Sequence, residues 1–460
     1  MEDIKQSLKK IVGSDYIATD KETLYAYSRD ASPEPGIMGD IIIRPGSSKE
    51  ISEILKIANE TKTPVWPRGA ATSLVFMGAP LKEGGIVLDL TRLNNIIEID
   101  EDAMSVTAES GITWGKLEAL LKKRNWFTGF IGPGPGYTST IGGAVSVASV
   151  MYGSAKYGTA CDILLGLEVV LPTGEIINTG SSAMKKSFKH TRYGIGPDSS
   201  GLFCGDNGIM GIKTKITFKL YPYPEYIRYI HYGYENFNQV INCLHEMASY
   251  RIASDLAVVD NKIGVSWGGS KRFPLHGLIK TYSEKMADAQ VEFLEKINNK
   301  YGGEKGKEYF PKMVLEDKRY EMFPMSGRLG NFGASCNKIP IKRATEFHNM
   351  FLEFMEEYKR EARKHHILWE FYAFISGNNI DILPTIMVPT DKKENYDFGR
   401  KLWKKLVQKE IKSGAIHYWL GKVIGDVVSD NYKREYFQFI RNIKQSIDPN
   451  NILNPTLLKL

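Results

Sequence analysis

The sequence predicts an α+β protein whose two halves are organised differently. In the first half, short apolar strands alternate with helices and with glycine-rich loops. The run Tyr221-Pro222-Tyr223-Pro224 interrupts this pattern and marks a boundary. Beyond it, alternating strands are separated by long charged helices, which is typical of an antiparallel sheet covered on one face by helices. We therefore divide the chain into residues 1–222, residues 223–424, and a segment 425–460 that returns to the first domain.

The first domain begins with a short helix and an irregular arm at residues 28–33. Ile41-Ile42-Ile43 reads as a buried strand, Ser47 or Ser48 caps the helix that follows, and residues 64–66 form the next strand. This order predicts a β-α-β unit, and ligands of such units bind where the strands end.

The rest of the first domain contains strands at 85–90, 165–171 and 214–220. It also contains a hairpin of 96–99 with 105–108, and a helix at 115–124 capped by Thr113. The second domain is predicted from a strand at 226–232 and from helices at 237–251, 284–299, 341–365 and 396–411. Paired strands at 369–376 and 380–388 complete it, and a final helix covers 432–447.

Composition narrows the classes of function. The chain has 460 residues, 42% hydrophobic and 25% charged, with a net charge of +7, and it contains no basic run that would suggest nucleic acid or an anionic membrane. Its 4 cysteines are widely spaced, which suggests free thiols in a reducing cytosol and neither a zinc nor an iron–sulfur site. The charged start resembles no signal peptide, and no apolar stretch is long enough for a transmembrane helix. We expect a cytoplasmic protein that forms a homo-oligomer and needs no metal.

Two loops carry the strongest functional signal. Pro67-Arg68-Gly69-Ala70-Ala71-Thr72-Ser73 follows the strand at 64–66, and residues 133–144 form a second loop rich in glycine and hydroxyl groups. Small residues let backbone amides approach an anion closely. The alternative for either loop is an ordinary connection, but two of them could wrap one long phosphate ligand. Their glycine spacing fits neither a Rossmann fingerprint nor a P-loop.

Several segments together resemble the vanillyl-alcohol-oxidase/PCMH superfamily of FAD enzymes. They are the two loops, Tyr157-Gly158-Thr159, the run Gly205-Asp206-Asn207-Gly208 with Ile209 to Ile212, and the ending Asp448 to Pro455. The likeness covers nearly the whole chain in the family's order. It implies a PCMH-type FAD-binding domain of two α/β subdomains, with an α+β cap domain over the flavin.

The resemblance also implies the residues that bind FAD, which we expect to be held without a covalent link. They are Pro67, Arg68, Gly69, Ala70, Ala71, Thr72, Ser73, Leu74, Pro133, Gly136, Thr138, Ile141, Gly142, Gly143, Ser146, Tyr157, Gly158, Gly208 and Ile212. Ala71 departs from the glycine that many relatives carry, and we expect the added methyl group to be a mild change.

Two branches of the family compete. The D-2-hydroxy-acid dehydrogenases carry metal-binding histidines in two segments, and neither segment is present here. Residues 380–393 and the run Gly414 to Trp419 look more like the vanillyl-alcohol oxidase and 4-cresol dehydrogenase branch. There, a tyrosine at the position of Tyr418 helps to hold a substrate phenolate, although the arginine that usually follows it is Trp419 here.

The candidate catalytic residues are Tyr418, Glu370, Tyr372, His417 and Arg328. Tyr418 is either the substrate tyrosine or a core residue, and because His417 alternates with it, only one of the two should face the flavin. Glu370 is either a base with a raised pKa or a solvent-exposed residue of a half-exposed strand, and we favour the exposed alternative. Arg328 is a loop cation that could bind a substrate anion, although a solvated loop is the favoured interpretation.

The main hypothesis is an FAD-dependent dehydrogenase, rather than an oxidase, that takes hydride from a hydroxylated or benzylic carbon of a small aromatic alcohol or alkylphenol. The alternatives are a metal-independent D-2-hydroxy-acid dehydrogenase of the lactate or glycolate type, and a flavin-bearing electron-transfer subunit of a larger complex. An electron acceptor, possibly an electron-transfer protein or a partner subunit, is expected in each case.

Overall fold

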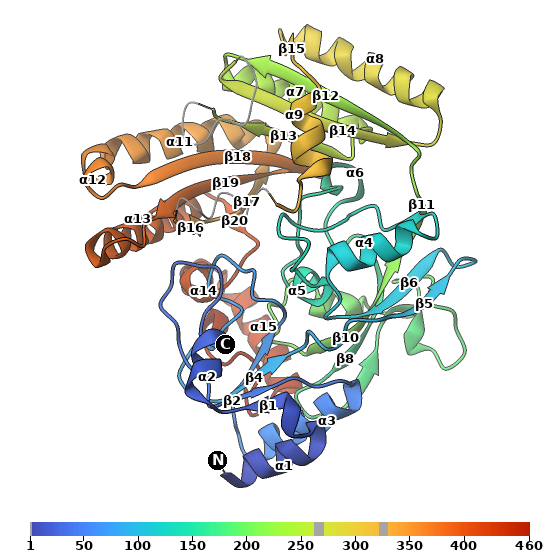
Figure 1. Cartoon of the computed structure of the whole chain (residues 1–460), viewed down its shortest axis with the longest axis vertical. Helices are drawn as coiled ribbons and strands as arrows, with labels where there is room; N and C mark the ends of the chain where they lie inside the picture. Colours follow the sequence, from blue (N-terminus) through green and yellow to red (C-terminus); the bar gives the residue numbers. More distant parts are fainter. Residues whose placement is uncertain (1, 262–270, 322–329) are drawn as a thin grey trace.

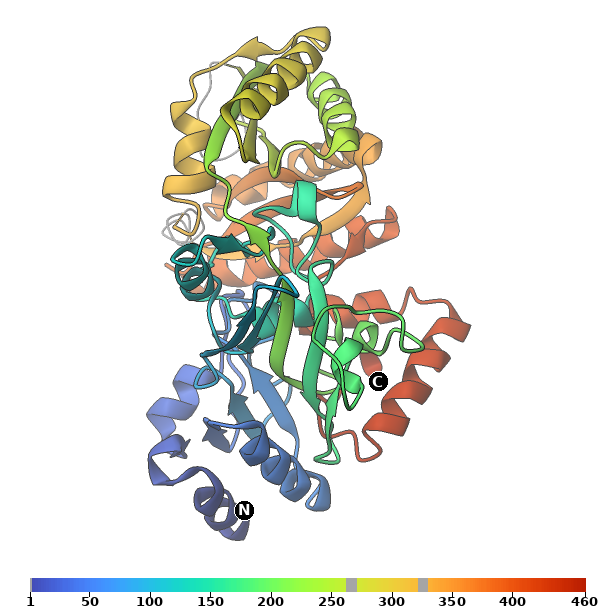
Figure 2. The ribbon, with the colours of Figure 1, turned by 90° about the vertical axis from the view of Figure 1, so that its right-hand side faces the viewer.

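Two lobes stack along the long axis of the molecule, and both chain ends lie in the lower lobe (Figure 1). The computed structural model describes residues 2–261, 271–321 and 330–460. The lower lobe is the first domain together with the C-terminal segment, and the upper lobe is the cap domain (Figures 1 and 2).

The first subdomain is built on a four-stranded sheet in the order β1-β2-β4-β3. Its elements are α1 (Glu2–Val12), β1 (Ile17–Ala18), α2 (Lys21–Tyr27), β2 (Ile41–Ile43), α3 (Ser48–Glu60), β3 (Val65–Arg68) and β4 (Ile86–Asp89). Ser47 caps α3 by accepting from the amide of Glu50, so the predicted β-α-β unit is present. Strands β2 and β3 each run parallel to β4, which lies between them.

The second subdomain is an antiparallel five-stranded sheet in the order β5-β6-β10-β8-β9. It contains β5 (Ile96–Asp100), β6 (Ser105–Glu109), α4 (Trp114–Lys122), β7 (Trp126–Phe127), α5 (Ile141–Ser146), α6 (Ser154–Tyr157), β8 (Leu164–Val170), β9 (Ile176–Asn178) and β10 (Ile212–Lys219), with β11 (Tyr221–Pro222) pairing β7 at its end. The predicted hairpin is β5 with β6, and Thr113 caps α4 as expected.

The cap domain is one antiparallel sheet with helices packed against it, as the sequence predicts. Its strands are β12 (Tyr226–Tyr234), β13 (Asp255–Val259), β14 (Phe273–Thr281), β15 (Glu304–Lys305), β16 (Asn331–Ala334), β17 (Asn337–Pro340), β18 (Leu368–Ser376), β19 (Asn379–Val388) and β20 (Ile416–His417). Its helices are α7 (Phe237–Tyr250), α8 (Glu284–Lys300), α9 (Tyr309–Lys312), α11 (Ala344–Glu357), α12 (Lys359–Lys364) and α13 (Lys393–Lys412).

The two faces of the cap sheet have different partners. Phe371 and Ala373 of β18 join the core formed with α7, α11 and α13. Phe374 and Leu383 belong to a smaller apolar cluster that also contains Val150 of the first domain. The second face of the sheet therefore closes over the first domain.

The C-terminal segment returns to the first domain through α14 (Lys422–Ser429) and α15 (Arg434–Ile447). The division expected after residue 424 cuts α14, and the amide of Lys422 already bonds to the carbonyl of Phe76. Beyond α15 the chain runs beside β3, where Val65 donates to the Ile452 carbonyl and accepts from the Asn454 amide.

Candidate functional site

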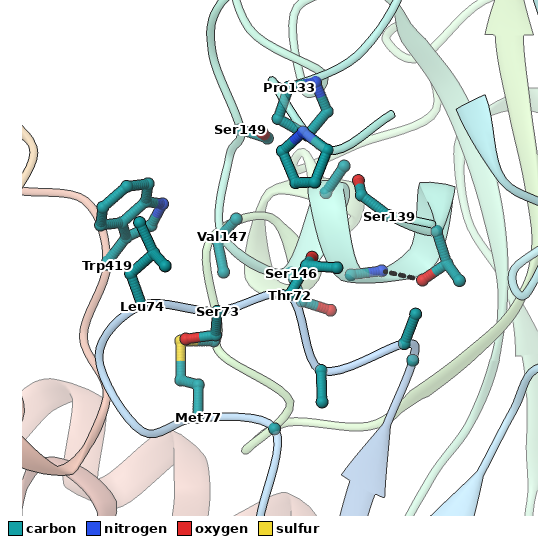
Figure 3. Close-up of a pocket in the computed structure, with 18 of the residues that line it drawn as sticks. Thr72, Ser73, Leu74, Met77, Pro133, Ser139, Ser146, Val147, Ser149 and Trp419 are labelled. Carbon is teal, nitrogen blue, oxygen red and sulfur yellow. Dashed lines mark hydrogen bonds between the residues drawn. The ribbon is translucent and has the colours of Figure 1, made fainter. Parts of the chain in front are cut away.

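A cavity of about 530 Å³ lies where the cap sheet meets both subdomains. Close up, Thr72, Ser73 and Leu74 form one wall, Ser146, Val147 and Ser149 lie across from them, and Trp419 stands at the side (Figure 3). The lining includes residues 67–74, 133–135, 138–140, 142–144, 207–208 and 211–213, together with Phe332, Cys336, Phe374, Leu383, Tyr418 and Trp419 of the cap side. The two glycine-rich loops thus meet at one cavity, as the sequence suggests.

The arm at residues 28–33 forms hydrogen bonds that hold the first glycine-rich loop in place. The Arg68 guanidinium donates to the carbonyls of Tyr27, Arg29 and Gly78 at 3.1, 2.9 and 2.5 Å from one nitrogen, and burial lowers its pKa. The Asp30 carboxylate accepts from the amide of Met77 at 2.8 Å. Arg68 lines the cavity, but that nitrogen organises backbone, so positioning the loop is a role that the sequence did not reveal.

Ala71 has φ of 53°, in the left-handed region that favours glycine. The expected mild effect of an alanine here is therefore wrong for the backbone, because this conformation strains any residue with a Cβ. The glycine at position 78 leaves room for Ala71, because a Cβ at Gly78 would lie 2.8 Å from both Cα and Cβ of Ala71.

The second loop ends in α5, whose Thr140 cap accepts from the Gly143 amide at 3.3 Å. The two glycines of this turn differ. A Cβ at Gly142 would lie 2.8 Å from Cβ of Ser110 and 2.9 Å from its carbonyl oxygen, so Gly142 is needed for packing. A Cβ at Gly143 would meet only the Thr140 hydroxyl, at 3.3 Å, which leaves the Gly143 backbone open to the cavity.

A third wall comes from the end of the first domain and the chain terminus. The Asn454 side chain donates to the Asn207 carbonyl at 2.8 Å, and both residues line the cavity. Lys213 lines it too, and its ammonium is 2.6 Å from the Asp206 carboxylate in a buried ion pair. The sequence motifs at both positions indicated a site, but not that they share one wall.

Tyr418 and Trp419 enter the cavity from the end of β20. Strand β20 pairs β17, so that His417 lies opposite Asn337. The rings of Tyr418 and Trp419 lie against each other with centroids 5.0 Å apart, and burial raises the pKa of Tyr418 well above its usual value. Trp419 thus places a neutral indole, whose N–H can only donate, beside Tyr418 at the position where the family resemblance implies an arginine.

His417 points the other way, toward α13. Its Nε2 is 3.7 Å from the Glu410 carboxylate, and burial lowers the pKa of His417 to about 3. Burial raises the pKa of Glu410 to about 8, so the two groups face each other as neutral species at neutral pH. Tyr418 lines the cavity and His417 does not, as expected from their alternation.

Glu370 is buried, with 4% of its surface exposed, so the favoured expectation of a solvent-exposed residue is wrong. It alternates along β18 with Tyr372 and Phe374, on the face turned to the first domain. Burial raises the pKa of Glu370 to about 7 and that of Tyr372 above its usual value. Neither residue lines the cavity, and Arg328 lies outside the described residues.

Four expected cofactor residues lie around the cavity without lining it: Gly136, Ile141, Tyr157 and Gly158. A Cβ at Gly136 would lie 2.2 Å from the ring of Tyr320, so a glycine at this position leaves space for that ring, which comes from the cap domain. Ile141 is in the core, and Tyr157 packs against Phe127 and Tyr221. The family resemblance of these segments predicted that they lie near the cofactor, but it could not show which residues line the cavity and which support it.

Comparison with known proteins agrees with this architecture. The family described as an FAD binding domain matches residues 39–180, and the C-terminal domain of FAD linked oxidases matches residues 348–457. The chain resembles p-cresol methylhydroxylase with substrate bound at a TM-score of 0.82, with 17% identity over 100% of this chain and 96% of that one. It resembles 4-ethylphenol oxidase from Gulosibacter chungangensis at 0.80, with 19% identity over 99% and 96%.

The chain is a member of the vanillyl-alcohol-oxidase/PCMH superfamily of FAD-dependent oxidoreductases. By sequence it is 26% identical to the glycolate oxidase subunit GlcD of Bacillus subtilis over 98% of this chain and 96% of that protein. It is 25% identical to D-lactate dehydrogenase of Archaeoglobus fulgidus over 90% of each.

FAD is the cofactor of this superfamily member, and the residues of the cavity fit it. At Gly143 the backbone faces the cavity, and a Cβ at this position would cover it. The loop Gly69 to Ser73 supplies small residues, which an anionic group can approach closely. Arg68 of the first loop also lines the cavity, and its guanidinium adds a positive charge beside these small residues.

Within residues 2–261, 271–321 and 330–460, no three His, Cys, Asp or Glu side chains gather in a way that could hold a metal ion. Over the same residues, no helix has the length and apolar character needed to cross a membrane.

Proposed function

We propose that this flavoprotein oxidises a small aromatic alcohol or alkylphenol at its hydroxylated or benzylic carbon, as a dehydrogenase rather than an oxidase. The observation that carries the proposal is the cap end of the cavity. There, Phe332, Phe374, Leu383, Tyr418 and Trp419 line it with aromatic and apolar groups. Such a wall favours a planar apolar substrate, because contact with it removes apolar surface from water.

Tyr418 supplies the polar contact in this wall. Its ring packs against Trp419 and lines the cavity, so its hydroxyl has a defined place from which to meet a substrate oxygen. Burial makes the phenolate costly, and the hydroxyl therefore stays protonated and acts as a hydrogen-bond donor. FAD, when bound, supplies the hydride acceptor.

The structural relatives support this proposal, since they are a p-cresol and a 4-ethylphenol enzyme. The second candidate is a metal-independent D-2-hydroxy-acid dehydrogenase. It is supported by the sequence relatives, which are named for glycolate and D-lactate and match nearly the whole chain. A subunit role is a third candidate, because the glycolate relative is itself named as a subunit.

Anaerobic stopped-flow spectroscopy separates these functions. The holoprotein is mixed with 4-ethylphenol, 4-hydroxybenzyl alcohol, D-lactate and glycolate, and flavin bleaching is followed. We expect the two aromatic compounds to bleach the flavin and the two hydroxy acids to leave it oxidised. Bleaching by D-lactate or glycolate alone would establish the second candidate, and no bleaching by any of them would favour the relay subunit. Admitting oxygen to the reduced protein then distinguishes oxidase from dehydrogenase.

A further inference from the structure

Two cysteines far apart in the sequence lie together behind α5. Cys161 precedes β8, and Cys204 follows a short 3₁₀ turn, Ser199–Phe203. Both belong to the same apolar surroundings: Cys161 is a member of the core cluster of the first domain, and Cys204 packs against that cluster. Cys161 is 8% exposed, whereas Cys204 is only partly buried, so a small molecule can reach the pair from the Cys204 side.

The segments that carry Cys161 and Cys204 both form a hydrogen bond to the same backbone carbonyl. The Cys161 thiol donates to the carbonyl of Val145 at 3.4 Å, and the amide of Gly205, next to Cys204, donates to the same oxygen at 2.9 Å. Val145 belongs to α5 between Gly143 and Ser146, which both line the cavity. Backbone contacts therefore hold the Cys161 segment and the Cys204 segment against the same peptide group.

Charges near the pair distinguish the two thiols. Arg192 donates to the Cys161 carbonyl at 2.7 Å and pairs with Asp198 at 2.8 Å. The neighbouring Cys161 side chain lowers the pKa of Cys204 against the opposing effect of burial, and the charges of Arg192 and Lys213 lower it further. The neighbouring Cys204 side chain, together with burial, raises the pKa of Cys161. Cys204 is thus the better nucleophile, because the thiolate is the reactive form.

We propose that Cys204 and Cys161 form a peroxide-responsive thiol pair that converts reversibly to an intramolecular disulfide. The Cys204 thiolate attacks one oxygen of hydrogen peroxide, the O–O bond breaks, and hydroxide leaves and takes a proton to become water, so that Cys204 becomes a sulfenic acid. The Cys161 sulfur then displaces the sulfenic hydroxyl, which leaves as a second water after taking the thiol proton. Two thiols and one peroxide thus give one disulfide and two waters, and a dithiol reductant reverses the change.

The remaining two cysteines of the chain differ from Cys204 in their exposure. Cys243 and Cys336 are buried, and burial raises the pKa of each thiol. We therefore expect them to stay reduced under conditions that oxidise the pair, and they serve as internal controls.

The test uses the FAD-loaded full chain. Protein is treated with hydrogen peroxide and blocked with N-ethylmaleimide under denaturing conditions, and its peptides are mapped by mass spectrometry. We expect two of the four thiols to be lost and a peptide pair joined through Cys161 and Cys204 to appear, and both changes to reverse with dithiothreitol. The disulfide closes a long loop, so the thermal midpoint of the oxidised protein should rise.

Two cysteine variants show which thiol reacts with peroxide first. In C161S, peroxide should leave a dimedone-reactive sulfenic acid on Cys204, with no rise in the thermal midpoint. In C204S, the one remaining thiol of the pair, Cys161, should stay unmodified and no disulfide should form. Three results would overturn the proposal: no reaction of Cys204, oxidation of Cys204 to sulfinic acid while Cys161 stays free, or disulfides only between chains. If neither variant retains FAD absorbance, the peptide map of the unaltered protein decides alone.

Discussion

Replacing Gly143 by valine tests whether the cavity holds FAD against the backbone of α5. In the protein itself a Cβ at Gly143 meets only the Thr140 hydroxyl, at 3.3 Å, so the apoprotein can accept the side chain with a small adjustment. The added groups project into a cavity of about 530 Å³, at a wall where the cofactor must lie close. We expect FAD affinity to fall and the apoprotein to remain folded.

The magnitude follows from overpacking. Forcing extra methyl groups into a well-packed contact costs about 1–3 kcal/mol. At 25 °C this corresponds to a dissociation constant for FAD that rises by a factor of roughly 5 to 150. The stability of the apoprotein should change by no more than about 0.5 kcal/mol, as for substitutions that break no packing contact.

Gly142→Ala is the matched control, because it adds one methyl group at the neighbouring position. Its Cβ would lie 2.8 Å from Cβ of Ser110 and 2.9 Å from the carbonyl oxygen of Ser110. The amide of Gly142 also donates to that carbonyl at 2.8 Å, so the turn cannot move away freely. We expect this variant to lower apoprotein stability by about 1–3 kcal/mol.

Both quantities are measured on apoprotein, with FAD titrated by fluorescence quenching and stability taken from urea unfolding. Gly143→Ala provides an intermediate point. An FAD dissociation constant for Gly143→Val within twofold of the unaltered protein would refute the assignment of this wall to the cofactor. An unchanged unfolding midpoint for Gly142→Ala would refute the packing argument.

Four further predictions concern the chemistry and the buried charges. Tyr418→Phe should keep FAD content and thermal midpoint while flavin reduction by substrate slows at least about tenfold, or roughly 1.4 kcal/mol of barrier; a fall in stability with an unchanged rate would make Tyr418 a core residue. FAD should appear in the supernatant after acid precipitation, and flavin retained in the pellet would reveal a covalent link. Activity should survive exhaustive chelation, and loss that a divalent ion restores would revive a metal mechanism. Burial raises the pKa of Glu370 from 4.5 to about 7, so the folded protein keeps a proton that the unfolded chain loses, and stability falls as pH rises across this range. Glu370→Gln should therefore stabilise the protein at pH 8 by up to roughly 3 kcal/mol and have little effect at pH 4; equal unfolding curves at both pH values would contradict the buried-acid assignment.

Local signals account for the features that sequence reasoning predicted. Apolar strands, helix caps and glycine-rich loops act within a few residues, so the β-α-β unit, the cap at Ser47 and the two loops could be read directly. The proline-rich run at 221–224 is likewise a local signal, and strand β12 begins just beyond it, at Tyr226. The expected single helix at 341–365 is two helices, α11 and α12, separated at Tyr358.

The sequence by itself determined the architecture, the cofactor family and the alternation that lets only one of His417 and Tyr418 face the cavity. Which of them does so was decided by the pairing of β20 with β17, a contact between segments about 80 residues apart. Long-range packing also buried Glu370, gave Arg68 three backbone carbonyls and brought Cys161 to Cys204. Burial and the identity of a partner depend on segments distant in sequence, and only the tertiary fold brings those segments together.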